Sequence, residues 1–306
     1  MTLLLVAIGV ALLAFPALAD RMSAASPPRE WSRVVAATLV GGVIVTEVGL
    51  VLTALPTVLH VPAIAQVTGA CHSIVDRINA GPVLGWTSFV AALASLVAIA
   101  VTIRRCRRLA ATAWVEPWLG DHLPRDGYEL VVVPTARVLA MSVPGTRPQV
   151  VVSDAVVARL DQGRLDAVIE HEAAHLRLGH RRYLLIAAAV DRAFGWVPGA
   201  RRSADSLRVA VEEWADDVAV GSSRSRRHHL RGALETLAEE LDLRSGSHAA
   251  DARLLRLSPA WSQAPIGGRL IGYSPAASLF MAGVAVAGLW LGASHHLIAL
   301  GGYCPR

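Results

Sequence analysis

The stretch VIEHEAAHLRLGH, residues 168–180, contains two histidines, His171 and His175, with Glu172 between them. His171 and His175 are four residues apart, so on a helix both imidazoles project from one face and can reach one metal ion. A catalytic Zn²⁺ site uses three protein ligands, and imidazole nitrogen is one of its preferred donors. Glu172 is placed to act as general base toward a water at such an ion. The pattern predicts a hydrolytic centre with one zinc ion.

A third protein ligand has to come from elsewhere in the chain. In the three-histidine pattern HExxHxxGxxH, the last histidine would fall at position 181, which is Arg181 here. His180 lies one residue short of that position. The alternative is a glutamate on a later helix.

The stretch SADSLRVAVEEWADDVAV, residues 203–220, supplies that helix. It holds two acidic pairs of identical spacing, Glu212 with Asp216 and Glu213 with Asp217. In either pair the glutamate would bind zinc, and the aspartate would hold a ligand histidine through its other ring nitrogen. Spacing alone does not choose between the pairs, and a solvated acidic helix face has the same pattern.

The elements that position these residues are also visible. GRLDAVIEHEAAHLRLGHRRYLLIAAAV, from about residue 162, has a continuous helical pattern, and Asp161 is its expected N-cap. Residues 129–145 and 147–160 are rich in valine and broken by Pro-Gly turn signals, which predicts short strands. Ser153 or Asp154 is expected to cap the helix after the strands, and Ser203 or Asp205 is expected to cap the helix with the acidic pairs. Residues 230–243 are expected to form an amphipathic helix, followed by loop-like residues 244–275.

The composition indicates a membrane protein. The mean hydropathy is +0.46, and 54% of residues are hydrophobic but only 17% charged. A bilayer-spanning helix needs about 20 apolar residues. Four stretches meet this need, at 2–18, 34–59, 83–103 and 277–300. The first has a signal-peptide alternative, because ALAD at 17–20 resembles a cleavage site; no basic residue precedes Arg21, so we expect a retained helix.

The arginines predict the orientation. RRCRR at 104–108 directly follows the third stretch, and the 60–82 loop has only Arg77. By the positive-inside rule, residues 104–275 are cytoplasmic, whereas both termini are external. We therefore expect three units: a membrane domain at 1–103 with three spans, a cytoplasmic zinc-binding domain at 104–275, and a last span with a short tail at 276–306. The expected fold class is a mainly α membrane protein with an α+β zincin-like domain between spans three and four.

For two charged features, we favour a structural explanation over a functional one. The basic run SSRSRRHHLRG, residues 222–232, has no interleaved aromatic residues, so contact with lipid headgroups or solvent is favoured over nucleic-acid binding. Glu47 lies in the middle of the second span, where an ionisable residue is costly. We expect a protonated carboxyl bonded to a neighbouring helix, with a functional group as the alternative.

HEAAHLRLGH followed by EWADD resembles the integral-membrane gluzincin metallopeptidases, and among them the penicillinase-antirepressor group of beta-lactam-sensor proteases. In that group a helix of pattern E-[L/W]-A-x-D follows the HExxH helix. Aligning Ala215 with the alanine of the pattern selects Glu213 as the zinc ligand and Asp217 as its outer partner. FGWVPGARR, residues 194–202, resembles the group's aromatic-proline turn, and three spans plus one fit its layout.

The resemblance implies a zinc endopeptidase with a regulatory role, such as cleavage of a cytosolic transcriptional repressor or another protein. PTARVLAMSVPGTRPQVVVSDAVVARL is similar to the group's paired edge strands, so the 131–152 hairpin is expected to receive an extended peptide. The printed sequence ends at Arg306, and we expect no extracellular penicillin-binding domain. The alternatives are a quality-control protease of the related heat-shock type and, from another class, a non-catalytic membrane receptor with a structural zinc site.

Overall fold

The computed structural model describes residues 2–18, 26–64, 81–112, 119–237, 253–254 and 256–257. Three apolar helices come first: α1 (Thr2–Leu18), α3 (Pro28–Leu59) and α6 (Pro82–Thr112). α3 and α6 are long and apolar enough to cross a membrane, and α1 is a shorter apolar helix. The first three predicted spans are thus confirmed as helices, and the fourth, 277–300, lies outside the described residues.

Close helix packing and an exposed apolar face both indicate membrane association. α1 packs against α3 through glycines: a Cβ at Gly9 would lie 2.2 Å from Thr46 Oγ1, and one at Gly49 would lie 2.8 Å from Val6 Cγ2. Small residues allow this approach in membrane helix pairs. The large apolar residues that α6 exposes are Val83, Trp86, Phe89, Val90, Leu93, Leu96, Val97, Val101 and Leu109. An apolar surface of this size favours contact with lipid.

The expected bond of Glu47 to a neighbouring helix is present. Glu47 is buried on α3, and the Ser95 hydroxyl on α6 donates a hydrogen bond to Glu47 Oε1. A buried carboxyl group without a partner would be costly, so this bond accounts for its place between two apolar helices.

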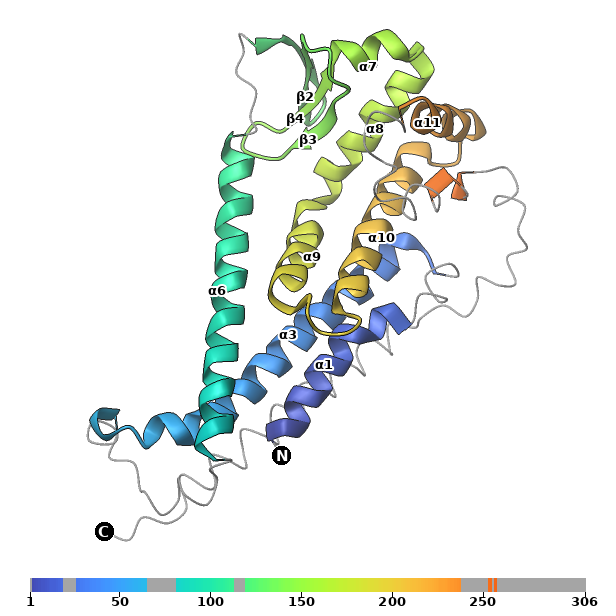
Figure 1. Ribbon diagram of the computed structural model, residues 1–306. Coiled ribbons are helices and arrows are strands. Elements are labelled where there is room, and N and C mark those ends of the chain that lie inside the picture. The colour runs from blue at the N-terminus through green and yellow to red at the C-terminus, as the bar shows by residue number, and fades with distance from the viewer. Residues whose placement is uncertain are drawn as a thin grey trace.

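A four-stranded mixed sheet lies beyond the C-terminal end of α6 (Figure 1). Its strands are β1 (Asp121–Arg125), β2 (Tyr128–Val133), β3 (Ala140–Val143) and β4 (Gln149–Ser153), in the order β1-β2-β4-β3. β2 and β4 are parallel, whereas β1 and β3 pair antiparallel to their neighbours. β4 is buried along its whole length, and β3 forms one edge of the sheet. The predicted strands are present, and β1 is an addition to them. The expected 131–152 hairpin is wrong in part, because β2 and β4 are parallel and only β3 and β4 form a hairpin.

Five helices follow the sheet: α7 (Asp154–Arg159), α8 (Gln162–Leu178), α9 (Arg181–Phe194), α10 (Ala200–Val220) and α11 (Arg224–Leu237). Two predicted caps are confirmed, because the Ser153 hydroxyl accepts from Val156 N–H and the Asp161 carboxylate accepts from Arg164 N–H. This part of the chain confirms the expected α+β unit within a mainly helical protein.

Three predicted helix boundaries are wrong. The helix expected to continue from 162 ends at Gly179, whose left-handed backbone (φ 62°) stops α8 and lets α9 begin. α10 begins at Ala200 after Gly199, so neither Ser203 nor Asp205 caps it. α11 begins at Arg224 rather than at 230, within the basic run.

α9 and α10 pack against the apolar helices α1, α3 and α6 (Figure 1). Phe194, Leu207 and Val211 belong to one core cluster with Leu13 of α1 and Leu39 of α3. Two hydrogen bonds reinforce it: Trp31 Nε1–H donates to Ser206 Oγ over 3.3 Å, and Ala17 N–H donates to Ser203 Oγ over 3.1 Å. The helix that carries the acidic pairs is therefore fixed directly to α1 and α3.

Candidate metal centre

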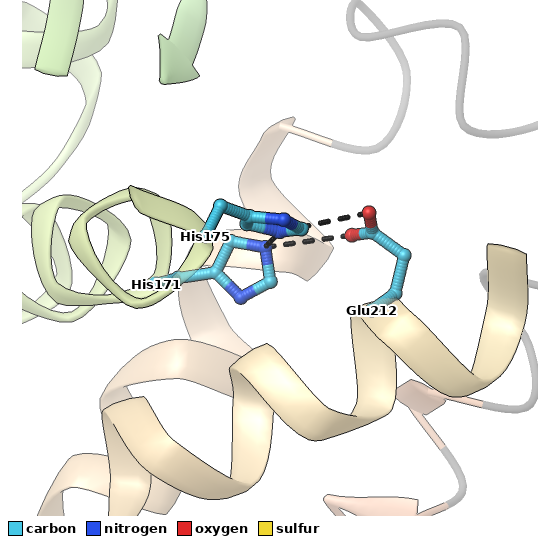
Figure 2. Close-up of side chains that lie close together, drawn as sticks. All are labelled: His171, His175 and Glu212. Atoms are coloured by element: carbon cyan, nitrogen blue, oxygen red, sulfur yellow. Dashed lines mark hydrogen bonds and ion pairs between the residues drawn. The ribbon is translucent and has the colours of Figure 1, made fainter. Parts of the chain in front are cut away.

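Three side chains from two helices converge on one point. His171 and His175 come from α8 and Glu212 comes from α10, and Figure 2 shows all three pointing toward one another. The two histidine Nε2 atoms are 3.1 Å apart. Glu212 Oε2 lies 3.4 Å from His171 Nε2, and Glu212 Oε1 lies 3.6 Å from His175 Nε2. The predicted histidine pair is brought together on one face of the helix.

This donor set fits a zinc ion. Zinc–ligand bonds of about 2.0–2.1 Å in a tetrahedron place neighbouring donor atoms about 3.3 Å apart. The separations of 3.1, 3.4 and 3.6 Å lie close to that value. Two imidazoles and one carboxylate are also a known ligand set of catalytic zinc. The residues present therefore suit the ion that the sequence predicts.

The structure does not bring the predicted Glu213 and Asp217 to the two histidines. Arg256 binds both of these side chains, with Nη1 3.1 Å from Glu213 Oε2 and Nη2 2.9 Å from Asp217 Oδ2. Glu212 lies beside the two histidines instead, where it could be the third ligand. Consecutive helical residues point about 100° apart, so the carboxylate of Glu213 is turned away from α8.

Small side chains let α8 and α10 approach closely enough for this arrangement. Ala173 and Ala174 of α8 are fully buried, as is Ala215 of α10. Ala167 of α8 and Ala219 of α10 lie in one apolar cluster. The acidic pair that lies on the same side of α10 as Ala215 and Ala219 is therefore the one that meets the histidines.

Asp216 is the outer partner of the site. Its Oδ1 lies 2.9 Å from His171 Nδ1, on the far side of the ring from Glu212. Arg253 holds the same carboxylate through two hydrogen bonds of 2.8 and 2.9 Å, and Arg253 Nη1 lies 3.2 Å from Glu212 Oε2. Burial opposes ionisation of Asp216, but Arg253 and His171 hold the pKa of its carboxyl well below its usual range. Sequence reasoning missed both arginines, since 244–275 carries no periodic pattern.

The charges of the ligands suit metal binding. Burial would raise the pKa of Glu212, but its bond to His171 and the charge of Arg253 lower it to about 2. Glu212 is thus ionised at neutral pH. Burial lowers the pKa of His175 to about 4, so this ring is neutral and its nitrogen lone pair is available. Burial would lower the pKa of His171, but its bonds to Asp216 and Glu212 raise it to about 10, so a metal ion would displace a proton there.

Glu172 lies between the ligand helix and the edge strand. It follows His171 on α8, and its carboxylate lies near the Ser142 hydroxyl of the edge strand β3. Burial raises the pKa of Glu172 above its ordinary value. A carboxylate with a raised pKa is a better proton acceptor, as a general base requires.

The comparisons with known proteins agree with this chemistry. Residues 120–220, which run from β1 through α10, match the model of peptidase family M48. No curated protein and no solved structure matches the chain. The match covers the whole candidate site and does not distinguish the antirepressor group. It supports assigning residues 120–220 to a membrane-type zinc metallopeptidase family.

Proposed function

We propose that this protein is a membrane-anchored zinc endopeptidase that cleaves extended segments of protein substrates. The observation that carries the proposal is the convergence of two Nε2 atoms and the Glu212 carboxylate at zinc-like separations. Glu172 lies beside them as the base. A receptor with a purely structural zinc site would need neither this base nor a free ligand position.

The residues divide the chemistry between them. His171, His175 and Glu212 would hold the ion, which when bound supplies a Lewis acid for the scissile carbonyl and lowers the pKa of a water. Glu172 takes a proton from the attacking water onto its carboxylate. It then gives that proton to the nitrogen of the leaving amine. Asp216 keeps the His171 ring in place throughout.

The edge strand β3 is the proposed substrate platform. Ser153 N–H donates to Leu139 O, which fixes the hydrogen-bonding register of the β3–β4 pair. Hydrogen-bonded positions alternate along an antiparallel pair, so the main-chain groups of Ala140 and Ser142 face the open edge. An extended peptide would pair with them. Because Ser142 also contacts Glu172, such a peptide would pass beside the base.

The physiological role that we propose is regulatory cleavage, and the natural substrate that we propose is a cytosolic transcriptional repressor. What supports it is the resemblance of HEAAHLRLGH and EWADD to the antirepressor proteases, together with the attachment of α10 to α1 and α3. A change in the membrane helices would reach Glu212 through that contact.

The enzymatic part of the proposal is tested with purified wild type and Glu172→Gln. Both are expected to hold one zinc ion, and the variant is expected to cleave unfolded casein about 10²–10⁴-fold more slowly. A chelator should abolish wild-type cleavage. Equal cleavage by both proteins would contradict the role of Glu172, and no zinc in either would contradict the site.

The regulatory part needs a separate comparison. Cells that express wild type or Glu172→Gln would be compared by proteomics for proteins that accumulate with the variant. Regulatory cleavage predicts one or a few proteins, among them a DNA-binding repressor. Accumulation of many misfolded membrane proteins would instead identify a quality-control protease.

A further inference from the structure

His180 is the last residue of the VIEHEAAHLRLGH stretch. It is neither one of the proposed metal ligands nor the proposed base, so its role is open. α8 ends at Gly179, which is in the left-handed conformation at φ 62°. The chain therefore turns back at once, and His180 N–H donates to His175 O over 3.1 Å. The His180 side chain is fully buried as a result.

The turn places two imidazole rings against each other. His180 Nδ1 lies 3.1 Å from His175 Nδ1, and the two rings meet edge to face with centroids 4.8 Å apart. His175 Nε2, at the opposite side of its ring, faces His171 Nε2 and Glu212. Each nitrogen of the His175 ring thus faces a different polar group.

The tautomers follow from this geometry. A neutral imidazole that binds a metal through Nε2 must carry its proton on Nδ1. With a metal bound at Nε2, His175 Nδ1–H would donate to His180 Nδ1, and His180 would carry its own proton on Nε2.

The other side of the His180 ring is enclosed by aromatic residues. His180 lies against Trp214 of α10 and Tyr183 of α9, with ring centroids 4.8 and 6.3 Å away. Among the described residues, no hydrogen-bond partner is present for its buried Nε2. A buried donor without a partner destabilises the fold. The favourable polar contact of the His180 ring is therefore the one that its Nδ1 makes.

We propose that His180 is a positioning residue for the metal centre, whose Nδ1 accepts the Nδ1–H of His175 and fixes that ring for binding through Nε2. It does for His175 what Asp216 does for His171. Trp214 packs against the His180 ring at an interplanar angle of 51° and limits its rotation. The Arg33 guanidinium of α3 lies over the Trp214 ring, 5.8 Å from its centroid. This inference rests on the proposed zinc peptidase function.

The test uses the reach of amide side chains. In His180→Asn the side-chain oxygen can take the place of Nδ1, whereas in His180→Gln it reaches toward the place of Nε2. His180→Leu keeps the approximate volume and removes every polar atom. His228→Leu, on an exposed residue of α11, is the matched control.

Two quantities are measured for each protein: the zinc affinity by competition with a chelating dye, and the thermal unfolding of the metal-free form. We expect His180→Leu and His180→Gln to bind zinc about 10–100-fold more weakly than wild type. His180→Asn should stay within a few-fold of wild type, and His228→Leu should equal it. The metal-free unfolding temperatures of the Asn and Gln variants should be similar.

The outcomes separate this inference from the proposed function. If wild type binds no zinc, the proposed function fails and this inference fails with it. If wild type binds zinc and His180→Gln binds it as tightly as His180→Asn, the positioning role alone is overturned. If His180→Leu does not fold, the zinc affinities of His180→Asn and His180→Gln still test the positioning role, because the two side chains carry the same amide group at different reach.

Discussion

Glu212 and Asp216 hold the His171 ring from its two opposite nitrogens. Glu212 Oε2 lies 3.4 Å from Nε2, and Asp216 Oδ1 lies 2.9 Å from Nδ1. The two carboxylates are one turn apart on α10, so a single helix supplies both the third ligand and the group that orients the first. The position of α10 against α8 therefore decides whether the metal centre forms.

Replacing the outer carboxylate should weaken zinc binding without removing it. We expect Asp216→Asn to lower the zinc affinity by about 10–100-fold, because the ring of His171 loses an ionised acceptor. Dye competition measures this. Asp217→Asn is the control, since Asp217 contacts Arg256 rather than a histidine. Equal affinities for the two variants would contradict the assignment of Asp216.

The two arginines should differ in their effect on stability. Arg253→Leu leaves the carboxylate of Asp216 buried, and loss of one partner of a buried ion pair costs about 3–5 kcal/mol. Arg256→Leu should cost less, because its partners Glu213 and Asp217 are 17% and 42% exposed, whereas Asp216 is 2% exposed, so water can partly replace this arginine. Thermal unfolding of the metal-free proteins gives the comparison. A larger loss from Arg256→Leu than from Arg253→Leu would contradict this order.

The catalytic helix was readable from the sequence because local rules determine it. Asp161 caps α8, the apolar positions place it against the sheet, and the i, i+4 spacing alone brings His171 and His175 together. Its end was missed, although Gly179 followed by a new helix is an ordinary termination signal.

The third ligand could not be chosen by local rules. The two acidic pairs lie about 100° apart around α10, both away from the apolar side that contains Leu207, Val211 and Trp214. Which pair meets α8 depends on how two helices cross, and this is a tertiary property. The buried Ala215 and Ala219, on the Glu212 side, were the available signal. The arginines that bind the two pairs are distant in sequence, at 253 and 256, and no pattern predicts them.

The edge of β3 can be tested through one main-chain group. Ser142→Pro removes an N–H that faces the open edge, so kcat/KM for protein substrates should fall about 2- to 10-fold, the equivalent of one hydrogen bond. Zinc content should not change. Ser142→Ala keeps the N–H but removes the hydroxyl that contacts Glu172, and it separates the two effects. If Pro and Ala reduce kcat/KM equally, the edge of β3 does not bind the substrate main chain.

The most direct test of the metal centre is the amount of zinc bound per chain at a fixed free-zinc concentration. Wild type, Glu212→Gln and Glu213→Gln would be compared after dialysis against the same zinc buffer. We predict about one zinc per chain for wild type and Glu213→Gln, and almost none for Glu212→Gln, since only Glu212 faces the histidines. Loss of zinc in Glu213→Gln with retention in Glu212→Gln would contradict the site described here.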